Sequence, residues 1–286
     1  MESLTILSPA KVNLYLKVMH KRRDGFHDIV SVMERISFCD CLKITVTKRK
    51  GLSFKCNWSY LENDNNLVIR AFRLLRKEIR PSFPGGIKIS LRKQIPVGSG
   101  LGGASSNAAS VLLGLNRLLN LGLSRKKMFL LGARLGSDVN FFISQARFAL
   151  VRGRGEEVFP IATTFRFSQY LILIPEPIST ARIYHSFSQK VRLTNSLDNA
   201  KLMTFALKQK DIFLLKRLLF NNLTPMAVEA SARLRKVYSL LNQSKGDFVL
   251  SGSGSSLVFL PGAADAGLKE TIEKIEGLRL KKVTTF

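Results

Sequence analysis

The sequence of 286 residues is poor in acidic side chains, in cysteine and in long apolar runs. Its cysteines, Cys39, Cys41 and Cys56, are too few and too irregularly spaced for a disulfide framework or a structural zinc site. No apolar run approaches the roughly 20 residues that cross a bilayer. The first residues also lack the basic and apolar segments of a secretory signal. We therefore expect a cytoplasmic protein without a membrane-spanning segment.

The shortage of acidic residues leaves a large positive charge. Asp and Glu number 20 against 45 Lys and Arg, so the formal net charge is +25 and the pI is about 10.4. Such a surplus favours an anionic partner, namely nucleic acid, a membrane surface or a phosphorylated small molecule. A basic but otherwise ordinary enzyme is the alternative. The hydrophobic content of 45% excludes a disordered chain and is sufficient for one large domain or two smaller ones.

Segments of alternating hydrophobicity recur between segments of helical spacing. They predict strands over residues 42–47, 87–92, 171–174, 248–250, 257–260 and 279–285. They predict helices over residues 105–120, 198–219, 226–243 and 263–276. Because strands and helices do not alternate regularly, we expect an α+β fold in two domains, residues 1–160 and 161–286.

Residues 95–110, which read IPVGSGLGGASSNAAS, place a glycine-rich segment between a predicted strand and a predicted helix. We expect Ser105 or Ser106 to be the N-cap of that helix. Glycines let the backbone approach a ligand, and the free N–H groups and dipole at a helix N-terminus favour an anion. The segment fits neither a Walker A loop nor a dinucleotide fingerprint. It predicts a phosphate-binding loop; a glycine-rich connector is the alternative.

This loop resembles the phosphate-binding motif of the GHMP kinases, the superfamily of galactokinase, homoserine kinase and mevalonate kinase. Residues 8–14, SPAKVNL, resemble the first motif of that family, and residues 250–256, LSGSGSS, resemble its third. One branch of the family phosphorylates the 2-hydroxyl of 4-diphosphocytidyl-2-C-methyl-D-erythritol in non-mevalonate isoprenoid precursor biosynthesis. Further segments are similar to that branch: residues 24–27, 66–71, 136–142 and 178–184.

The resemblance implies a two-domain GHMP kinase fold with an N-terminal ribosomal-S5-domain-2-like domain and a C-terminal ferredoxin-like domain. It implies ATP and Mg²⁺ as cofactors, the cytidine diphosphate compound as small-molecule substrate, and a monomer or homodimer without nucleic-acid or membrane partners. Two rival hypotheses stay open. One is a kinase for a mevalonate or homoserine type of acceptor, against which Phe26 and His27 argue. The other is a nucleic-acid binder, which would need exposed aromatic rings among the basic residues of 201–245.

The resemblance assigns catalysis to Lys11 and Asp138. Asp138 would be the base near the attacking hydroxyl, and Lys11 a fixed cation that stabilises developing charge. A helix N-cap is the alternative for Asp138, and a solvated lysine on an edge strand is the alternative for Lys11. Ser137 and Asn140 stand where the branch usually has Ala and Pro.

The remaining assignments concern the two ligands. ATP is assigned to Pro96, Gly98, Ser99, Gly100, Leu101, Gly102, Gly103, Ser105, Ser106 and Asn66. The two serines Ser105 and Ser106 are candidates for contact with phosphate or Mg²⁺, and Asn66 for the adenine side. The substrate is assigned to Asn13, Phe26, His27, Thr180 and Tyr184. The resemblance places His27 at the edge of the cytosine, and it places the rings of Phe26 and Tyr184 on the two faces of the base. No residue is assigned as a metal ligand, and Asn221 is given no role.

Overall fold

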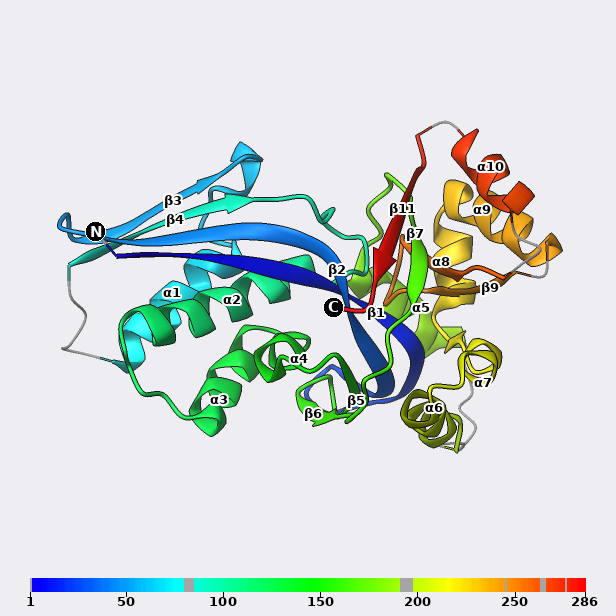
Figure 1. Ribbon diagram of the computed structural model, residues 1–286, viewed down its shortest axis with the longest axis horizontal. Helices are drawn as coiled ribbons and strands as arrows, with labels where there is room; N and C mark the ends of the chain where they lie inside the picture. The colour runs from blue at the N-terminus through cyan, green and yellow to red at the C-terminus, as the bar shows by residue number, and fades with distance from the viewer. Residues whose placement is uncertain (1, 80–84, 191–197, 245, 263–265, 276) are drawn as a thin grey trace. The chain divides into compact units, whose positions relative to one another are not determined.

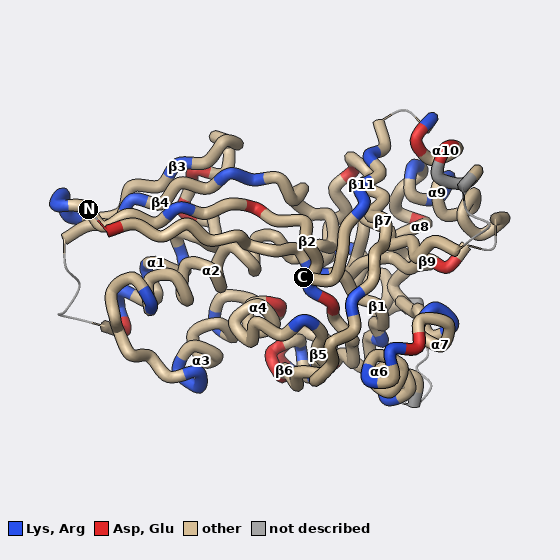
Figure 2. The backbone as a smooth tube through the Cα atoms, viewed as in Figure 1, with Lys and Arg blue, Asp and Glu red and all other residues tan. Residues whose placement is uncertain are grey.

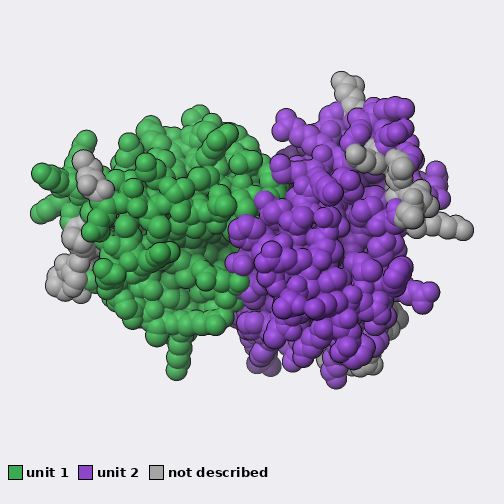
Figure 3. Space-filling model, in the orientation of Figure 1, with its two compact units in different colours: residues 1–10, 38–95, 102–145 green, residues 11–37, 96–101, 146–286 purple. Residues whose placement is uncertain are grey.

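The structure is a computed structural model, and the residues that it describes form two compact units (Figure 3). It describes residues 2–79, 85–190, 198–244, 246–262, 266–275 and 277–286. Unit 1 comprises residues 1–10, 38–95 and 102–145, and unit 2 comprises residues 11–37, 96–101 and 146–286. Because the units interleave along the chain, they do not test the domain boundary expected after residue 160, which stays a prediction.

Two long strands belong to both units: β1 (Ser3–Lys21) and β2 (His27–Thr47). The other elements of unit 1 are β3 (Gly51–Cys56), η1 (Ser59–Leu61), α1 (Leu67–Glu78), β4 (Gly86–Arg92), α2 (Gly103–Leu118), α3 (Arg125–Leu135) and α4 (Val139–Ser144). In this unit β4 pairs with β2 in antiparallel fashion and with β3 in parallel fashion. The strands predicted over 42–47 and 87–92 are thereby confirmed.

The helices of unit 1 lie along one face of its strands (Figure 1). Helix α2 comes close to the strands at Gly114, where a Cβ atom would clash with the side chains of Ile6 and Ile44. The absence of a side chain at Gly114 therefore lets the helix rest directly on β1 and β2. This contact anchors the helix whose N-terminus follows the glycine-rich segment.

Unit 2 contains the remaining elements: β5 (Phe148–Arg152), β6 (Glu157–Pro160), β7 (Ser168–Leu173), α5 (Thr180–Lys190), α6 (Asp198–Gln209), α7 (Ile212–Arg217), β8 (Phe220–Asn221), α8 (Thr224–Ala230), α9 (Ala232–Gln243), β9 (Asp247–Leu250), β10 (Leu257–Leu260), α10 (Ala266–Glu273) and β11 (Arg279–Thr284). Four of its strands form an antiparallel sheet in the order β11-β7-β10-β9. The predicted strand pair at 248–250 and 257–260 and the predicted last strand are confirmed.

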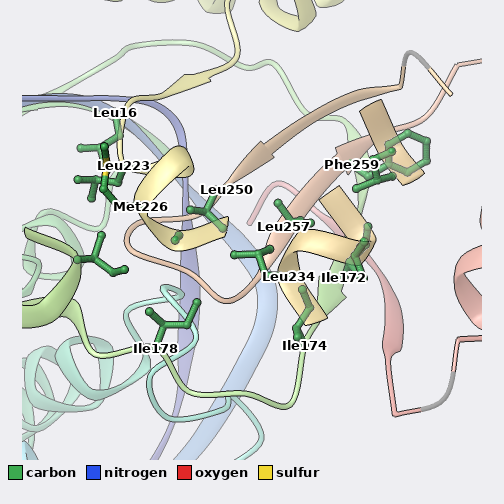
Figure 4. Packing of buried hydrophobic residues seen from close by; sticks show 14 of the residues in the cluster. Leu16, Ile172, Ile174, Ile178, Leu223, Met226, Leu234, Leu250, Leu257 and Phe259 are labelled. Carbon is green, nitrogen blue, oxygen red and sulfur yellow. The ribbon is translucent and has the colours of Figure 1, made fainter. Parts of the chain in front are cut away.

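A hydrophobic core lies between this sheet and the helices of unit 2 (Figure 4). Ile172 and Leu257 come from the sheet, Met226 from α8 and Leu234 from α9. Leu16 of β1 packs into the same cluster, so the strand that carries the first motif is held by the core. Burial of such side chains contributes roughly 1.5–3 kcal/mol each.

Two predicted helices are each broken in two. The helix predicted over 198–219 divides into α6 and α7, because Lys210 adopts a left-handed φ of 59° and Asp211 caps α7 through the backbone N–H of Leu214. The helix predicted over 226–243 divides into α8 and α9 at Ser231, whose hydroxyl caps α9. Residues 263–265 and 276 of the helix predicted over 263–276 lie outside the described residues; α10 covers most of the rest.

The positive charge is spread over both units (Figure 2). On α6 and α7 the aromatic rings of Phe205 and Phe213 are 53% and 79% exposed, and Lys201, Lys208 and Arg217 are exposed on the same helices. The rival hypothesis of a nucleic-acid binder requires this combination. Among the described residues, no helix has the length and apolarity that crossing a membrane requires.

Candidate functional site

The side chain of Lys11 lies in a buried polar network of unit 2. Its ammonium donates to Asn13 Oδ1 at 2.6 Å, and Asn13 Nδ2 donates to Ser31 Oγ at 2.8 Å. Lys11 is 3% exposed and Asn13 is 1% exposed. Ser31 in turn donates to the backbone oxygen of Tyr15 at 2.7 Å. These bonds hold a cation in one orientation, and the alternative of a solvated lysine does not describe this residue.

Residues 96–101 of the glycine-rich segment pack against the third motif, also within unit 2. Ser251 Oγ donates to Gly100 O at 3.0 Å, and the backbone N–H of Ser256 donates to Ser99 O at 3.2 Å. Gly100 has a φ of 76°, and a Cβ there would clash with the backbone oxygen of Ser251. The close approach of the two loops therefore requires glycine at position 100.

Lys11 lies beside both of these loops. Its backbone N–H donates to Leu101 O at 2.9 Å. A Cβ at Gly252 would lie 3.4 Å from the Lys11 ammonium. At the entrance of the glycine-rich segment, Ser99 Oγ donates to Pro96 O at 2.8 Å and closes a tight turn that contains Gly98. The structure thus brings a buried cation together with two glycine-rich loops, as an anion site requires.

Sequence reasoning missed the residue that fixes the third loop. Asn221 Nδ2 donates to Leu250 O at 2.8 Å and to Gly252 O at 2.7 Å, and its Oδ1 accepts from the backbone N–H of Leu223 at 2.9 Å. Asn221 is 7% exposed. The sequence signal for this role of Asn221 was weak, because an asparagine pair followed by leucine is equally typical of an ordinary turn.

The assigned residues Gly102, Gly103, Ser105 and Ser106 lie at the start of α2 in unit 1. The N-cap of α2 is Gly102, with φ 68°, and not Ser105 or Ser106 as expected. The left-handed backbone of Gly102 starts the helix without a side-chain cap, so both serines lie inside its first turn. Ser106 is fully buried, and within the described residues its hydroxyl has no hydrogen-bond partner. A buried hydroxyl of this kind fits a ligand at the N-terminus of the helix.

Asp138 immediately precedes α4 and lies in unit 1. It occupies the N-cap position of that helix, but its side chain makes no capping hydrogen bond. Two residues earlier, a Cβ at Gly136 would lie 3.8 Å from Ser105 Oγ, so this segment runs beside the start of α2. Helix capping therefore does not account for the carboxylate, and its assignment as the base stays a prediction.

Asn66 is the N-cap of α1. Its Oδ1 accepts from the backbone N–H of Val68, and its Nδ2 donates to Leu61 O, both at 2.9 Å. Both ends of the amide are therefore used in holding the helix start. Contact with adenine stays a prediction that rests on the resemblance alone.

The residues assigned to the cytosine gather in unit 2. The imidazole of His27 lies 5.3 Å from the ring of Tyr184 between centroids, and its Nε2 is 2.7 Å from Ser188 Oγ. Burial, with the nearby charges of Lys21 and His20, lowers the pKa of His27, so the ring is neutral at pH 7. Residue Tyr184 stands on α5 and His27 begins β2.

Phe26 and Thr180 complete the assigned substrate residues. The ring of Phe26 is 48% exposed, and the guanidinium of Arg154 lies 5.0 Å from its centroid. Thr180 Oγ1 is 2.8 Å from Ser253 Oγ, which links the start of α5 to the third loop. An exposed ring that holds a cation against one face presents a flat apolar surface for stacking.

A second missed group lies in unit 1, hydrogen bonded to the backbone at the start of the glycine-rich segment. Asp40 is fully buried and accepts from the ammonium of Lys93 at 2.5 Å and from Asn107 Nδ2 at 3.0 Å. It also accepts from the backbone N–H groups of Gln94 and Ile95 at 2.7 and 2.9 Å. Asp40 thus ties the end of β4 to the second turn of α2. In the sequence it was one aspartate just before the strand predicted over 42–47, with no spacing to distinguish it.

The arrangement offers no preformed cage for a metal ion. Within the described ranges, no three side chains of His, Cys, Asp or Glu gather in one place. Magnesium usually keeps several waters and takes only one or two protein oxygens beside its phosphate ligands. The unpartnered hydroxyl of Ser106 suits that kind of contact.

The fold and the loops define a GHMP kinase. Residues 66–145 match the GHMP kinases N terminal domain family. The homoserine kinase of Cytophaga hutchinsonii has the same fold, with a TM-score of 0.72 at 16% identity. The crystal structure of a 4-(cytidine 5'-diphospho)-2C-methyl-D-erythritol kinase superimposes with a TM-score of 0.79 at 28% identity and covers 98% of each chain. The α+β GHMP kinase fold expected from the sequence is confirmed.

Relatives of known name indicate which branch of the GHMP kinases the chain belongs to. The 4-diphosphocytidyl-2-C-methyl-D-erythritol kinase of Geobacter metallireducens is 34% identical over 278 residues, which are 97% of this chain and 93% of that protein. The enzyme of the same name from Pelobacter propionicus is 33% identical over 97% of this chain and 96% of its own length. The chain therefore belongs to the 4-diphosphocytidyl-2-C-methyl-D-erythritol kinase family.

Proposed function

We propose that this protein transfers the γ-phosphoryl group of ATP to the 2-hydroxyl of 4-diphosphocytidyl-2-C-methyl-D-erythritol, a step of non-mevalonate isoprenoid precursor biosynthesis. The observation that carries the proposal is the buried ammonium of Lys11 beside two glycine-rich loops. Family membership supports the choice of acceptor, and the grouping of His27 with Tyr184 supports a cytosine. Mevalonate and homoserine carry no nucleobase that His27 and Tyr184 could bind.

The phosphates of ATP are held by the glycine-rich segment and by the N-terminus of α2. Backbone N–H groups and the helix dipole stabilise negative charge there. The hydroxyls of Ser105 and Ser106 would contact phosphate or Mg²⁺, which when bound would neutralise charge on the phosphates. ATP supplies the phosphoryl group, whereas the protein positions the reactants and stabilises the negative charge of the phosphates.

The acceptor hydroxyl loses its proton to Asp138, while Lys11 stabilises charge on the transferred group. Asn13 orients Lys11 and hydrogen bonds to substrate. The base stacks on Phe26 and Tyr184 with its edge toward His27, and Thr180 contacts the substrate from the start of α5. Base–aromatic stacking contributes roughly 1–3 kcal/mol.

The test is release of ADP on addition of the cytidine diphosphate substrate, with mevalonate and homoserine as control acceptors. Asp138→Asn and Lys11→Met are expected to lower kcat at least about a hundredfold, since each removes a group that acts on the reacting atoms. Asp64→Asn and Lys43→Met, at exposed positions, serve as matched controls. Turnover of mevalonate or homoserine in preference to the cytidine compound would contradict the proposal.

A second candidate function, RNA binding, rests on the exposed rings of Phe205 and Phe213 among the basic side chains of α6 and α7. A salt-dependent RNA-binding assay with the Phe213→Ala variant tests it. Loss of binding with Phe213→Ala, at unchanged ADP release, is the result expected for this second function.

A further inference from the structure

Ser188 on α5 makes two hydrogen bonds with its hydroxyl group. Its Oγ donates to the backbone oxygen of Tyr184 at 3.0 Å, one helical turn earlier, and lies 2.7 Å from Nε2 of His27. Tyr184 and His27 are residues that the proposed function places around the cytosine. Ser188 itself belongs to none of the motifs found in the sequence.

The single hydroxyl proton of Ser188 determines the direction of its two hydrogen bonds. A serine hydroxyl carries one proton, so it can serve both partners only if it donates to Tyr184 O and accepts from the imidazole. The opposite arrangement, with the hydroxyl donating to Nε2, forfeits the bond to Tyr184. Because His27 is neutral, the proton on Nε2 leaves a lone pair on Nδ1. Among the described residues, no donor to Nδ1 is present.

We propose that Ser188 is a positioning residue that holds His27 in the Nε2–H tautomer, so that Nδ1 accepts a hydrogen bond from the amino group of the cytosine. This inference rests on the proposed function. Cytosine presents an amino donor at the position where uracil presents an oxygen acceptor. A lone pair at Nδ1 favours the first and repels the second. The stacking rings cannot make this distinction, because every base has a flat face.

The tautomer is measured by ¹⁵N NMR of histidine-labelled protein, since protonated and unprotonated ring nitrogens resonate far apart. The chain has three histidines, so His20→Gln and His185→Gln variants assign the signals. The wild type is expected to show the Nε2–H form of His27. Ser188→Ala is expected to give a mixture, and Ser188→Thr, which keeps the hydroxyl, to restore the wild-type spectrum. A wild-type proton on Nδ1 would overturn the inference.

Base selection is measured as the ratio of kcat/KM for the cytidine substrate to that for its uridine counterpart. Loss of one oriented hydrogen bond is expected to lower this ratio about tenfold in Ser188→Ala, with kcat on the cytidine substrate within about threefold of wild type. Ser186→Ala makes the same chemical change on the same helix and is expected to leave the ratio unchanged. A purely structural role of Ser188 would weaken both substrates alike, and that result would also overturn the inference.

Failure of the proposed function is recognised separately. An enzyme that turned over neither nucleotide would refute the proposed function, while the NMR spectra of the free protein would still decide whether Ser188 sets the tautomer. An enzyme that is active on the cytidine substrate but has the same ratio in Ser188→Ala would refute the role of Ser188 alone.

Discussion

Two buried carboxyl groups on β2 are held in different ways. Glu34 in unit 2 and Asp40 in unit 1 are both fully buried. Asp40 accepts from the ammonium of Lys93, whereas the groups that bind Glu34 are the neutral amide of Gln169 and the hydroxyl of Thr285, each at 2.7 Å. Burial raises the pKa of Glu34 to about 8 despite these two bonds. At pH 7 Glu34 is therefore mostly protonated.

The two carboxyl groups differ in the charge of the side chains that bind them. A cation within hydrogen-bond distance compensates for lost hydration, and neutral donors do so only in part. The ion pair of Asp40 and Lys93 supports the backbone just before the glycine-rich segment. The neutral acid Glu34 instead holds the C-terminal strand end through Thr285.

The largest expected effect comes from breaking the ion pair. Asp40→Asn leaves the Lys93 ammonium buried without a counter-ion, which is expected to lower the free energy of unfolding by about 3–5 kcal/mol. The KM for ATP is expected to rise as well, because the backbone that Asp40 holds leads into the phosphate-binding loop. Denaturant unfolding and ADP release measure the two effects.

The double variant Asp40→Asn with Lys93→Met is the control for this prediction. It removes both charges and is expected to recover part of the lost stability, since the unpaired cation is gone. A single variant that unfolds at the same denaturant concentration as wild type would show that the ion pair contributes nothing.

The second-largest expected effect is the contribution of Glu34 to the pH dependence of the free energy of unfolding. Its pKa is raised in the folded state from an ordinary 4.5 to about 8. The stability that this group contributes is therefore complete below pH 4.5 and is lost as the pH rises through 8. Between pH 5 and the folded-state pKa of about 8, at about 1.4 kcal/mol per pH unit, the loss is expected to reach roughly 4 kcal/mol. Glu34→Gln cannot ionise and is expected to remove this decline.

The measurement is the free energy of unfolding of wild type minus that of Glu34→Gln between pH 5 and 9, which cancels the other titrating groups. Glu157→Gln, at an exposed position of β6, is the matched control with no such trend. A difference that is constant over this pH range would contradict the neutral state of Glu34.

The smallest effect is expected from Thr285→Val, which removes one donor to Glu34 and keeps the shape of the side chain. The hydrogen bond to Glu34 is lost, together with the one that Thr285 Oγ1 accepts from the backbone N–H of Phe167 at 3.2 Å, at a cost of about 1–3 kcal/mol. Thr284→Val, at the exposed neighbouring position, is expected to be within about 0.5 kcal/mol of wild type. If the two variants unfold alike, Thr285 does not hold the buried acid.

Local patterns predicted several elements of the fold. The alternation of Leu42, Ile44 and Val46 is a property of the strand itself, and that strand exists as predicted. The long segments of helical spacing were correctly predicted to be helical, but the positions at which these helices break were not predicted. Lys210 and Ser231 interrupt them through backbone angles that compete with an intact apolar spacing, so periodicity alone could not locate the breaks.

The sequence by itself determined the family, the glycine-rich segment and the residue types expected at the site, because these are written in contiguous motifs. Only the tertiary structure decided which residues support them. Asp40 lies 53 positions from Lys93 and Glu34 lies 251 positions from Thr285, and Asn221 reaches the third loop from a separate strand. Hydrogen bonds between such distant residues depend on how the chain folds back on itself, and no local pattern records that.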